Sequence, residues 1–199
     1  MGSMTAAGIL VIFIAVTGAF AADGPRTQLR QQQQEERKAH YDAQRQENRE
    51  FRQSLQNQNL TQEQKAQATV DHRNQQYNEN KDFQAKMHQE NIRFLQQQFA
   101  SNTKMTQAQK DELVNFFNSK YQEDVSYRDA RHAENIAFFQ KTANDPTLTQ
   151  EQKKQALKDY VAQQKTAAKE HRQAQRDERQ TEMSRIRGEV KANSNSTAP

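Results

Sequence analysis

The fold is decided by three segments that match one another in motif order and in spacing. They are QENREFRQSLQNQNLTQEQK (46–65), QENIRFLQQQFASNTKMTQAQK (89–110) and AENIAFFQKTANDPTLTQEQK (133–153). Their Glu-Asn pairs begin at residues 47, 90 and 134, so the period is 43 to 44 residues. A segment of this length that recurs in order indicates one supersecondary unit used several times.

Each segment ends on a signal for the start of a helix. A Thr is followed three residues later by a Gln, which is the pattern of a capping box, and an apolar residue precedes each Thr, where a hydrophobic staple would pack. We therefore expect helices to begin near residues 62, 107 and 150. The helix-cap motif comprises Leu60, Thr61, Gln64, Met105, Thr106, Gln109, Leu148, Thr149 and Gln152.

The sequence therefore predicts an all-α protein of about four long helices. The expected helices lie near 27–56, 62–100, 107–142 and 150–187, within a helical repeat domain over 22–188. Short connections between long helices favour antiparallel neighbours, so we expect a thin, repeat-built bundle or rod. A polar tail over 189–199 is expected to be disordered.

Apolar and aromatic residues recur at intervals of eleven. Eleven residues in three turns is about 3.67 residues per turn, which is typical of straight or slightly right-handed packing rather than a heptad coiled coil. The alternative is that a few aromatic residues fall into step by chance. The clearest rows are Leu29, His40 and Phe51; Phe83 and Phe94; Tyr77, His88 and Phe99; and Phe116, Tyr127 and Phe138.

The composition excludes a single large hydrophobic core. Of 199 residues, 33% are hydrophobic and 27% charged, the mean hydropathy is -1.25, and by count 32 residues are Gln. So little apolar surface cannot offset the entropy of ordering a compact globule of this length. The same scarcity argues against a buried catalytic pocket and favours thin rods with narrow apolar seams.

The first 21 residues read as a secretory signal peptide. Residues 6–20 are a continuous apolar run, and Ala19-Phe20-Ala21 supplies a cleavage site. The run is short for a membrane span, which needs roughly 20 residues. An uncleaved membrane anchor remains the alternative, because residues 1–5 carry no Lys or Arg. We expect the mature chain in the periplasm or outside the cell, where its lack of Cys forgoes disulfide bonds.

Catalytic and metal-binding signals are absent from the sequence. The five His include no pair four residues apart, and there is no Gly-rich phosphate loop or nucleophile elbow. We expect no enzyme activity, no catalytic residue, no metal and no cofactor, and we expect the histidines to be solvated or boundary residues. The alternative for the histidines is a metal site that assembles between helices or between chains. Arginine clusters near both ends are diluted by Asp and Glu, so no nucleic acid partner is expected. A basic helix would still allow weak contact with an anionic membrane surface.

The three cap motifs resemble a known family. Leu60-Thr61-Gln62-Glu63-Gln64 and Leu148-Thr149-Gln150-Glu151-Gln152 are similar to the Leu-Thr-x-x-Gln motif of the periplasmic Spy and CpxP family, and residues 105–109 form a third copy with Met in place of Leu. That family comprises small, secreted, helical proteins that form thin, cradle-shaped dimers and act as ATP-independent chaperones or stress-sensing adaptors. The resemblance implies a periplasmic homo-oligomer that holds unfolded or partner proteins on a concave surface mixing apolar patches with positive charge.

Two functional hypotheses follow. In the first, partly exposed apolar side chains bind unfolded segments weakly and release them without ATP; the alternative for each of these side chains is the core. In the second, the chain is a structural helical protein that assembles into filaments, a surface layer or a scaffold. The candidate client- or partner-binding residues are Phe94, Leu95, Phe99, Phe116, Phe117, Phe138 and Phe139.

Overall fold

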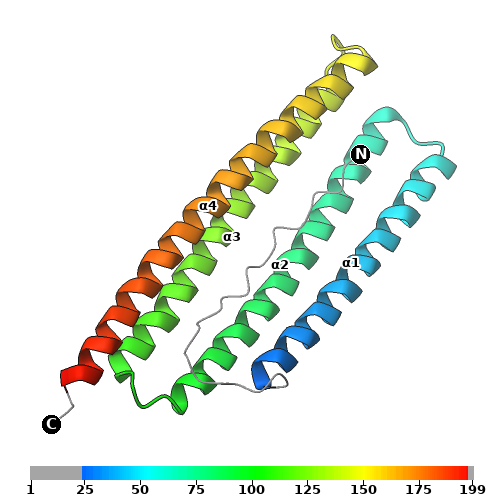
Figure 1. The fold of residues 1–199 in the computed structure, drawn as a ribbon. Helices are drawn as coiled ribbons and strands as arrows, with labels where there is room; N and C mark the ends of the chain where they lie inside the picture. The colour runs from blue at the N-terminus through cyan, green and yellow to red at the C-terminus, as the bar shows by residue number, and fades with distance from the viewer. Residues whose placement is uncertain (1–23, 197–199) are drawn as a thin grey trace.

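The computed structural model describes residues 24–196, with side chains described as far as residue 192. Four α-helices make up this part of the chain: α1 (Pro25–Asn57), α2 (Gln62–Ala100), α3 (Gln107–Asn144) and α4 (Gln150–Ser196). They run alternately up and down, joined by short connections (Figure 1). The prediction of an all-α fold with four long antiparallel helices is confirmed. The predicted signal peptide lies outside the described residues.

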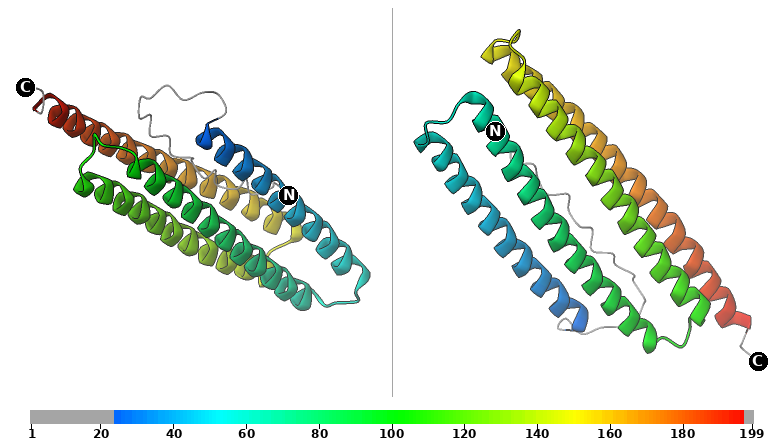
Figure 2. Two further views of the ribbon diagram at one scale, coloured as in Figure 1. Left: turned by 90° about the horizontal axis from the view of Figure 1, so that it is seen from below. Right: turned by 180° about the vertical axis from the view of Figure 1, so that it is seen from behind.

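The helices form a layer that is one helix thick. Close backbone approaches join α1 to α2, α2 to α3 and α3 to α4, and no other pair within the described residues. Figure 2 shows that α1 and α4 lie on the same side of α2 and α3. The molecule is therefore an open, curved layer and not a closed bundle.

Capping boxes start three of the helices, as predicted. The Gln64 backbone N–H donates to the Thr61 hydroxyl at 3.2 Å, and the Thr61 N–H donates to the Gln64 side chain at 2.9 Å. The same reciprocal pair joins Thr106 to Gln109 and Thr149 to Gln152. Each box satisfies two of the backbone donors that a helix start leaves unpaired.

Apolar packing concentrates where the α2–α3 connection meets the end of α4. Five buried side chains form this cluster, and it includes Met105 from the connection itself. Elsewhere little apolar surface is buried, in keeping with the low hydrophobic fraction. The cluster consists of Phe99, Met105, Leu113, Phe117 and Ile186, with Ile92, Leu95, Val114, Phe116, Met183 and Val190 packed against it.

Side-chain amides replace apolar packing between α1 and α2. Gln44 is buried and donates to the Gln76 carbonyl, while the Gln76 amide donates to the Gln44 carbonyl, both at 3.3 Å. Asn48 donates to the Gln76 side chain at 2.8 Å, and Asn80 to that of Gln44 at 3.1 Å. Because each amide both donates and accepts, a polar helix surface can pack without leaving these groups unpaired.

Helix α4 enters the segment 189–199, for which the sequence predicts a disordered tail. Helix α4 continues to Ser196. Arg185 pairs with Glu189 one turn later at 2.5 Å, and Val190 packs against the apolar cluster. These contacts extend the helix beyond the point where its sequence becomes uniformly polar.

Replacing Thr106 tests the contribution of the caps. Thr106→Ala removes the oxygen that accepts from the backbone N–H of Gln109, a residue buried in the fold. We expect the free energy of unfolding to fall by about 1 kcal/mol in urea denaturation. Thr106→Ser, which keeps the acceptor, is the control, and equal stability of the two variants would contradict the role given to the cap.

Candidate functional site: the inner face of the helix layer

All five histidines lie at contacts between neighbouring helices. Each imidazole stacks on an aromatic ring of the facing helix, with ring centroids 3.8–4.2 Å apart, and its Nε2 contacts an Asn or Asp side-chain oxygen three residues before that ring. We call such a contact a histidine stack. The stacks are His40 on Phe83 with Asn80, His72 on Phe51 with Asn48, His88 on Tyr121 with Asn118, His132 on Tyr77 with Asn74, and His171 on Tyr127 with Asp124.

A sixth stack departs from this pattern. Tyr160 takes the place of His and stacks on Phe138 with centroids 3.9 Å apart. Asn135 lies three residues before Phe138, as the pattern requires. Both the Asn135 Oδ1 and the Tyr160 hydroxyl are buried without a hydrogen-bond partner. The hydroxyl therefore does not reproduce the bond that an imidazole Nε2 makes in the other five stacks.

The stacks define where each helix faces its neighbours. On α2, Phe83 faces α1 and His88 faces α3, an offset of five residues. On α3, His132 faces α2 and Tyr127 faces α4, an offset of five in the opposite direction. At eleven residues per three turns, five residues rotate about 130° around a helix.

These offsets explain why the layer curves. Around the axis of α2, the row that faces α1 and the row that faces α3 are separated by about 130° on one side of the layer and by about 230° on the other. The same angles separate the two contact rows of α3, about 130° and about 230°. Because α3 runs antiparallel to α2, the opposite offsets bend the layer in the same sense. Helices α1 and α4 consequently stand on one side of α2 and α3, as Figure 2 shows. We call the narrower, concave side the inner face.

Arginine dominates the charge of the inner face. The stacked residues fix the orientation of each helix, so each remaining residue can be assigned to a face by its rotation around the helix axis. Nine of the 15 arginines lie on the inner face by this measure, together with Lys65, Lys120 and Lys153. Within the described residues, Asp124 is the only carboxylate on this face. A net charge of only +4 thus conceals a strong separation of charge between the two faces. The arginines are Arg26, Arg30, Arg37, Arg52, Arg73, Arg128, Arg131, Arg172 and Arg179.

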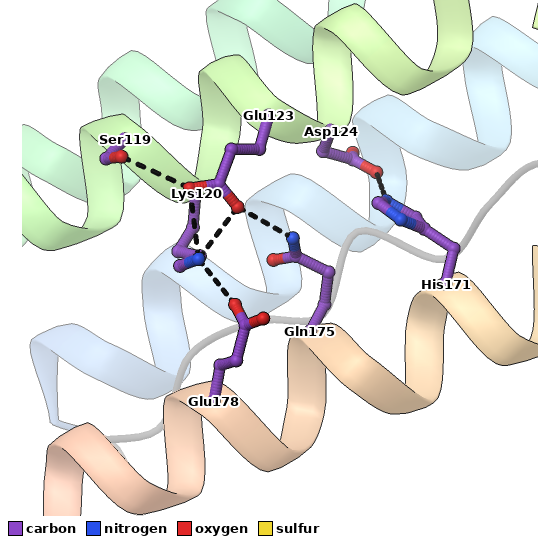
Figure 3. Close-up of polar contacts among 7 residues, drawn as sticks. All are labelled: Ser119, Lys120, Glu123, Asp124, His171, Gln175 and Glu178. Atoms are coloured by element: carbon purple, nitrogen blue, oxygen red, sulfur yellow. Dashed lines mark hydrogen bonds and ion pairs between the residues drawn. The ribbon is translucent and has the colours of Figure 1, made fainter.

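The lone inner carboxylate is already neutralised at the contact between α3 and α4. Asp124 pairs with Arg128 at 3.1 Å and lies 3.3 Å from His171 Nε2. One turn away, Lys120 joins Glu123 of α3 to Glu178 of α4 (Figure 3). Hydrogen bonding to Lys120 holds the pKa of Glu123 below its usual value. These charges hold two helices together at the contact between α3 and α4.

Several polar atoms of the inner face are buried without a hydrogen-bond partner. Donors of this kind are found on Arg37, Arg131 and Arg179. Acceptors of this kind are the side-chain oxygens of Gln33 and Gln175. Unpaired buried polar atoms cost stability, so this face carries a polar penalty that the rest of the fold offsets.

The structure divides the seven predicted binding residues into two groups. Four lie on the rows that face a neighbouring helix, namely Phe94, Phe99, Phe116 and Phe138. Three lie on the inner face: Leu95, Phe117 and Phe139. The Arg73 guanidinium lies 4.1 Å from the centroid of the Phe139 ring.

The expected partial exposure is wrong for two of these residues. Phe99 and Phe117 are only 4% and 3% exposed, because both belong to the apolar cluster. Val161, at 37%, is the only large apolar side chain classed as exposed in the described part of the chain. The inner face is therefore chiefly cationic and only secondarily apolar.

The sequence contained a signal for the stacks that the eleven-residue rows revealed only in part. An Asn or Asp precedes a Phe or Tyr by three positions at 48–51, 74–77, 80–83, 91–94, 118–121, 124–127 and 135–138. Six of these seven aromatic residues are found in stacks, and Phe94 is the exception. The spacing could have predicted the role of the histidines, which the sequence alone left as solvated or boundary residues.

No protein family, curated protein or solved structure matches this chain. Among the described helices, none is long and apolar enough to cross a membrane. Residues 24–192 also contain no group of three or more His, Asp or Glu placed to hold a metal ion.

Tyr160→His should complete the sixth stack. The imidazole Nε2–H would donate to the unpaired Asn135 Oδ1, as in the other stacks. We expect the free energy of unfolding to rise by about 1 kcal/mol, which raises the melting temperature by about 2–4 °C for a chain of this size. The gain should disappear in an Asn135→Ala background; a gain of the same size there would contradict the proposed bond.

Proposed function

We propose that this chain is an exported binding protein that holds polypeptide segments on its inner face without ATP, as a chaperone or an envelope-stress adaptor. The observation that carries the proposal is the segregation of arginine onto an open, concave face that has a single carboxylate. Arginine binds carboxylates through paired hydrogen bonds and stacks on aromatic rings, so one residue type can contact many polypeptide sequences.

The accessible polar side chains of the inner face support a polypeptide as the ligand. The donors of Arg52, Arg73 and Arg172 lie on three different helices, and the amide of Gln84, which both donates and accepts, lies among them. A peptide backbone offers both C=O and N–H groups along its length and can pair with both kinds of atom. Half-buried apolar side chains among the arginines, such as Leu95 and Phe139, add weak apolar contacts.

The outer rows of α1 and α4, at the two edges of the layer, argue against the rival proposal of an open-ended assembly. If the layer continued through the same contacts, α1 and α4 would need His and aromatic residues on their outer rows. The corresponding positions are Gln34, Arg45 and Gln56 on α1, and Lys165, Arg176 and Arg187 on α4. No residue there can form a histidine stack, so we favour a discrete protein over a filament.

Suppression of aggregation tests the proposed function directly. The purified protein should prevent a chemically unfolded client from scattering light at near-stoichiometric ratio, without nucleotide. Replacing Arg37 and Arg179 together by Gln should raise the amount needed several-fold, because it removes two inner guanidinium groups whose buried nitrogens lack partners.

A matched double variant separates position from net charge. Arg49→Gln with Arg93→Gln removes the same charge from exposed residues outside the inner face and should suppress aggregation like the unaltered protein. Circular dichroism and melting curves establish that each variant folds. The proposal fails if the unaltered protein gives no suppression at several-fold excess, or if the inner and outer variants lose activity equally.

A further inference from the structure

The histidine stacks differ in one respect that bears on acid conditions. Four of the five imidazoles face an Asn oxygen, and only His171 faces a carboxylate, that of Asp124. The four Asn stacks hold α1 to α2 and α2 to α3, whereas the Asp stack holds α3 to α4. The same contact geometry is thus built with two kinds of partner, a neutral amide and a carboxylate.

We propose that the layer is a proton-sensitive device in which acid loosens the contacts of α1 with α2 and of α2 with α3, while the α3–α4 contact holds. A neutral imidazole donates from Nε2 to the amide oxygen and stacks on the ring without burying a charge. A protonated imidazole places a partly buried cation opposite a neutral amide, which does not compensate the charge. At His171 the facing group is instead the Asp124 carboxylate, 3.3 Å from Nε2, which compensates a positive charge.

The surroundings of the two α2–α3 histidines favour the neutral form. His88 faces Tyr121 and Asn118 of α3; burial lowers its pKa, and the hydrogen bond to Asn118 opposes this only in part. His132 faces Tyr77 and Asn74 of α2 and lies near the Arg73 cation; burial again lowers its pKa, and Asp129 of its own helix opposes this only in part.

At the α1–α2 contact, the surroundings of His72 favour the neutral form as well. His72 faces Phe51 and Asn48 of α1, with Glu47 on α1 and Glu79 on α2 nearby; burial outweighs both carboxylates and lowers its pKa. The second histidine of this contact, His40, faces Phe83 and Asn80 of α2 and lies beside Tyr41 of its own helix.

The direction of the pH dependence follows from these shifts. A histidine with a lowered pKa in the folded chain takes up its proton more readily when unfolded. The stabilisation is therefore complete above the ordinary pKa of 6.5 and is lost as the pH falls below it. Carboxylates remain ionised in this range, so ion pairs such as Lys81 with Asp129 persist and the effect is confined to the stacks.

Hydrogen exchange resolved along the chain tests the proposal. After correction for intrinsic rates, amides of α1 and α2 should exchange at least about tenfold faster at about pH 5.5 than at about pH 7.5, while those of α4 keep their protection. Equal loss of protection in all four helices, or no loss in any of them, would overturn the proposal.

Two reciprocal substitutions exchange the responses. Asp124→Asn gives the α3–α4 contact the partner found in the other stacks, so α4 should also lose protection at about pH 5.5. The double variant Asn74→Asp with Asn118→Asp gives the α2–α3 contact carboxylates and should keep its protection in acid. If either variant retains the pattern of the unaltered protein, the side-chain partner of the histidine does not set the response. The outcome is independent of what the inner face binds.

Discussion

The structure depends on a single repeated contact, an imidazole stacked on an aromatic ring and hydrogen-bonded to an Asn or Asp one turn before that ring. With so few apolar residues, the helices cannot be held together by a continuous hydrophobic seam. A stacked ring buries apolar area on both of its faces, and the bond at Nε2 fixes its rotation and its register. Each contact therefore aligns two helices with few side chains.

The register of these contacts also sets the shape of the molecule. An eleven-residue interval keeps a row of contacts straight along a helix, and an offset of five residues between two rows fixes the angle between neighbours. The reversal of this offset on the antiparallel α3 makes the layer curve in one sense. The curvature also gives the two faces different compositions. Residues within the sector of about 130° between the two contact rows lie on the concave side, and the remaining residues lie on the convex side.

Much of the fold could be predicted from the sequence. Capping boxes at Thr61, Thr106 and Thr149 placed three helix starts at the residues where they are found, since a cap is a local interaction between neighbours in the chain. The eleven-residue rows placed residues such as His88 and Tyr127 correctly in line. The site was harder to predict: Phe99 and Phe117 were expected to be partly exposed, yet they are buried by residues of other helices.

The sequence by itself determined the helices, their starts and their antiparallel order, because these depend on interactions within about one turn and on the length of the connections. Only the tertiary structure decided which face of each helix meets its neighbour. That choice depends on pairs such as His132 and Tyr77, which lie 55 positions apart in the chain. It also decided that arginines scattered through the sequence gather on one face, since the sign of the curvature, and not the local sequence, selects the concave side.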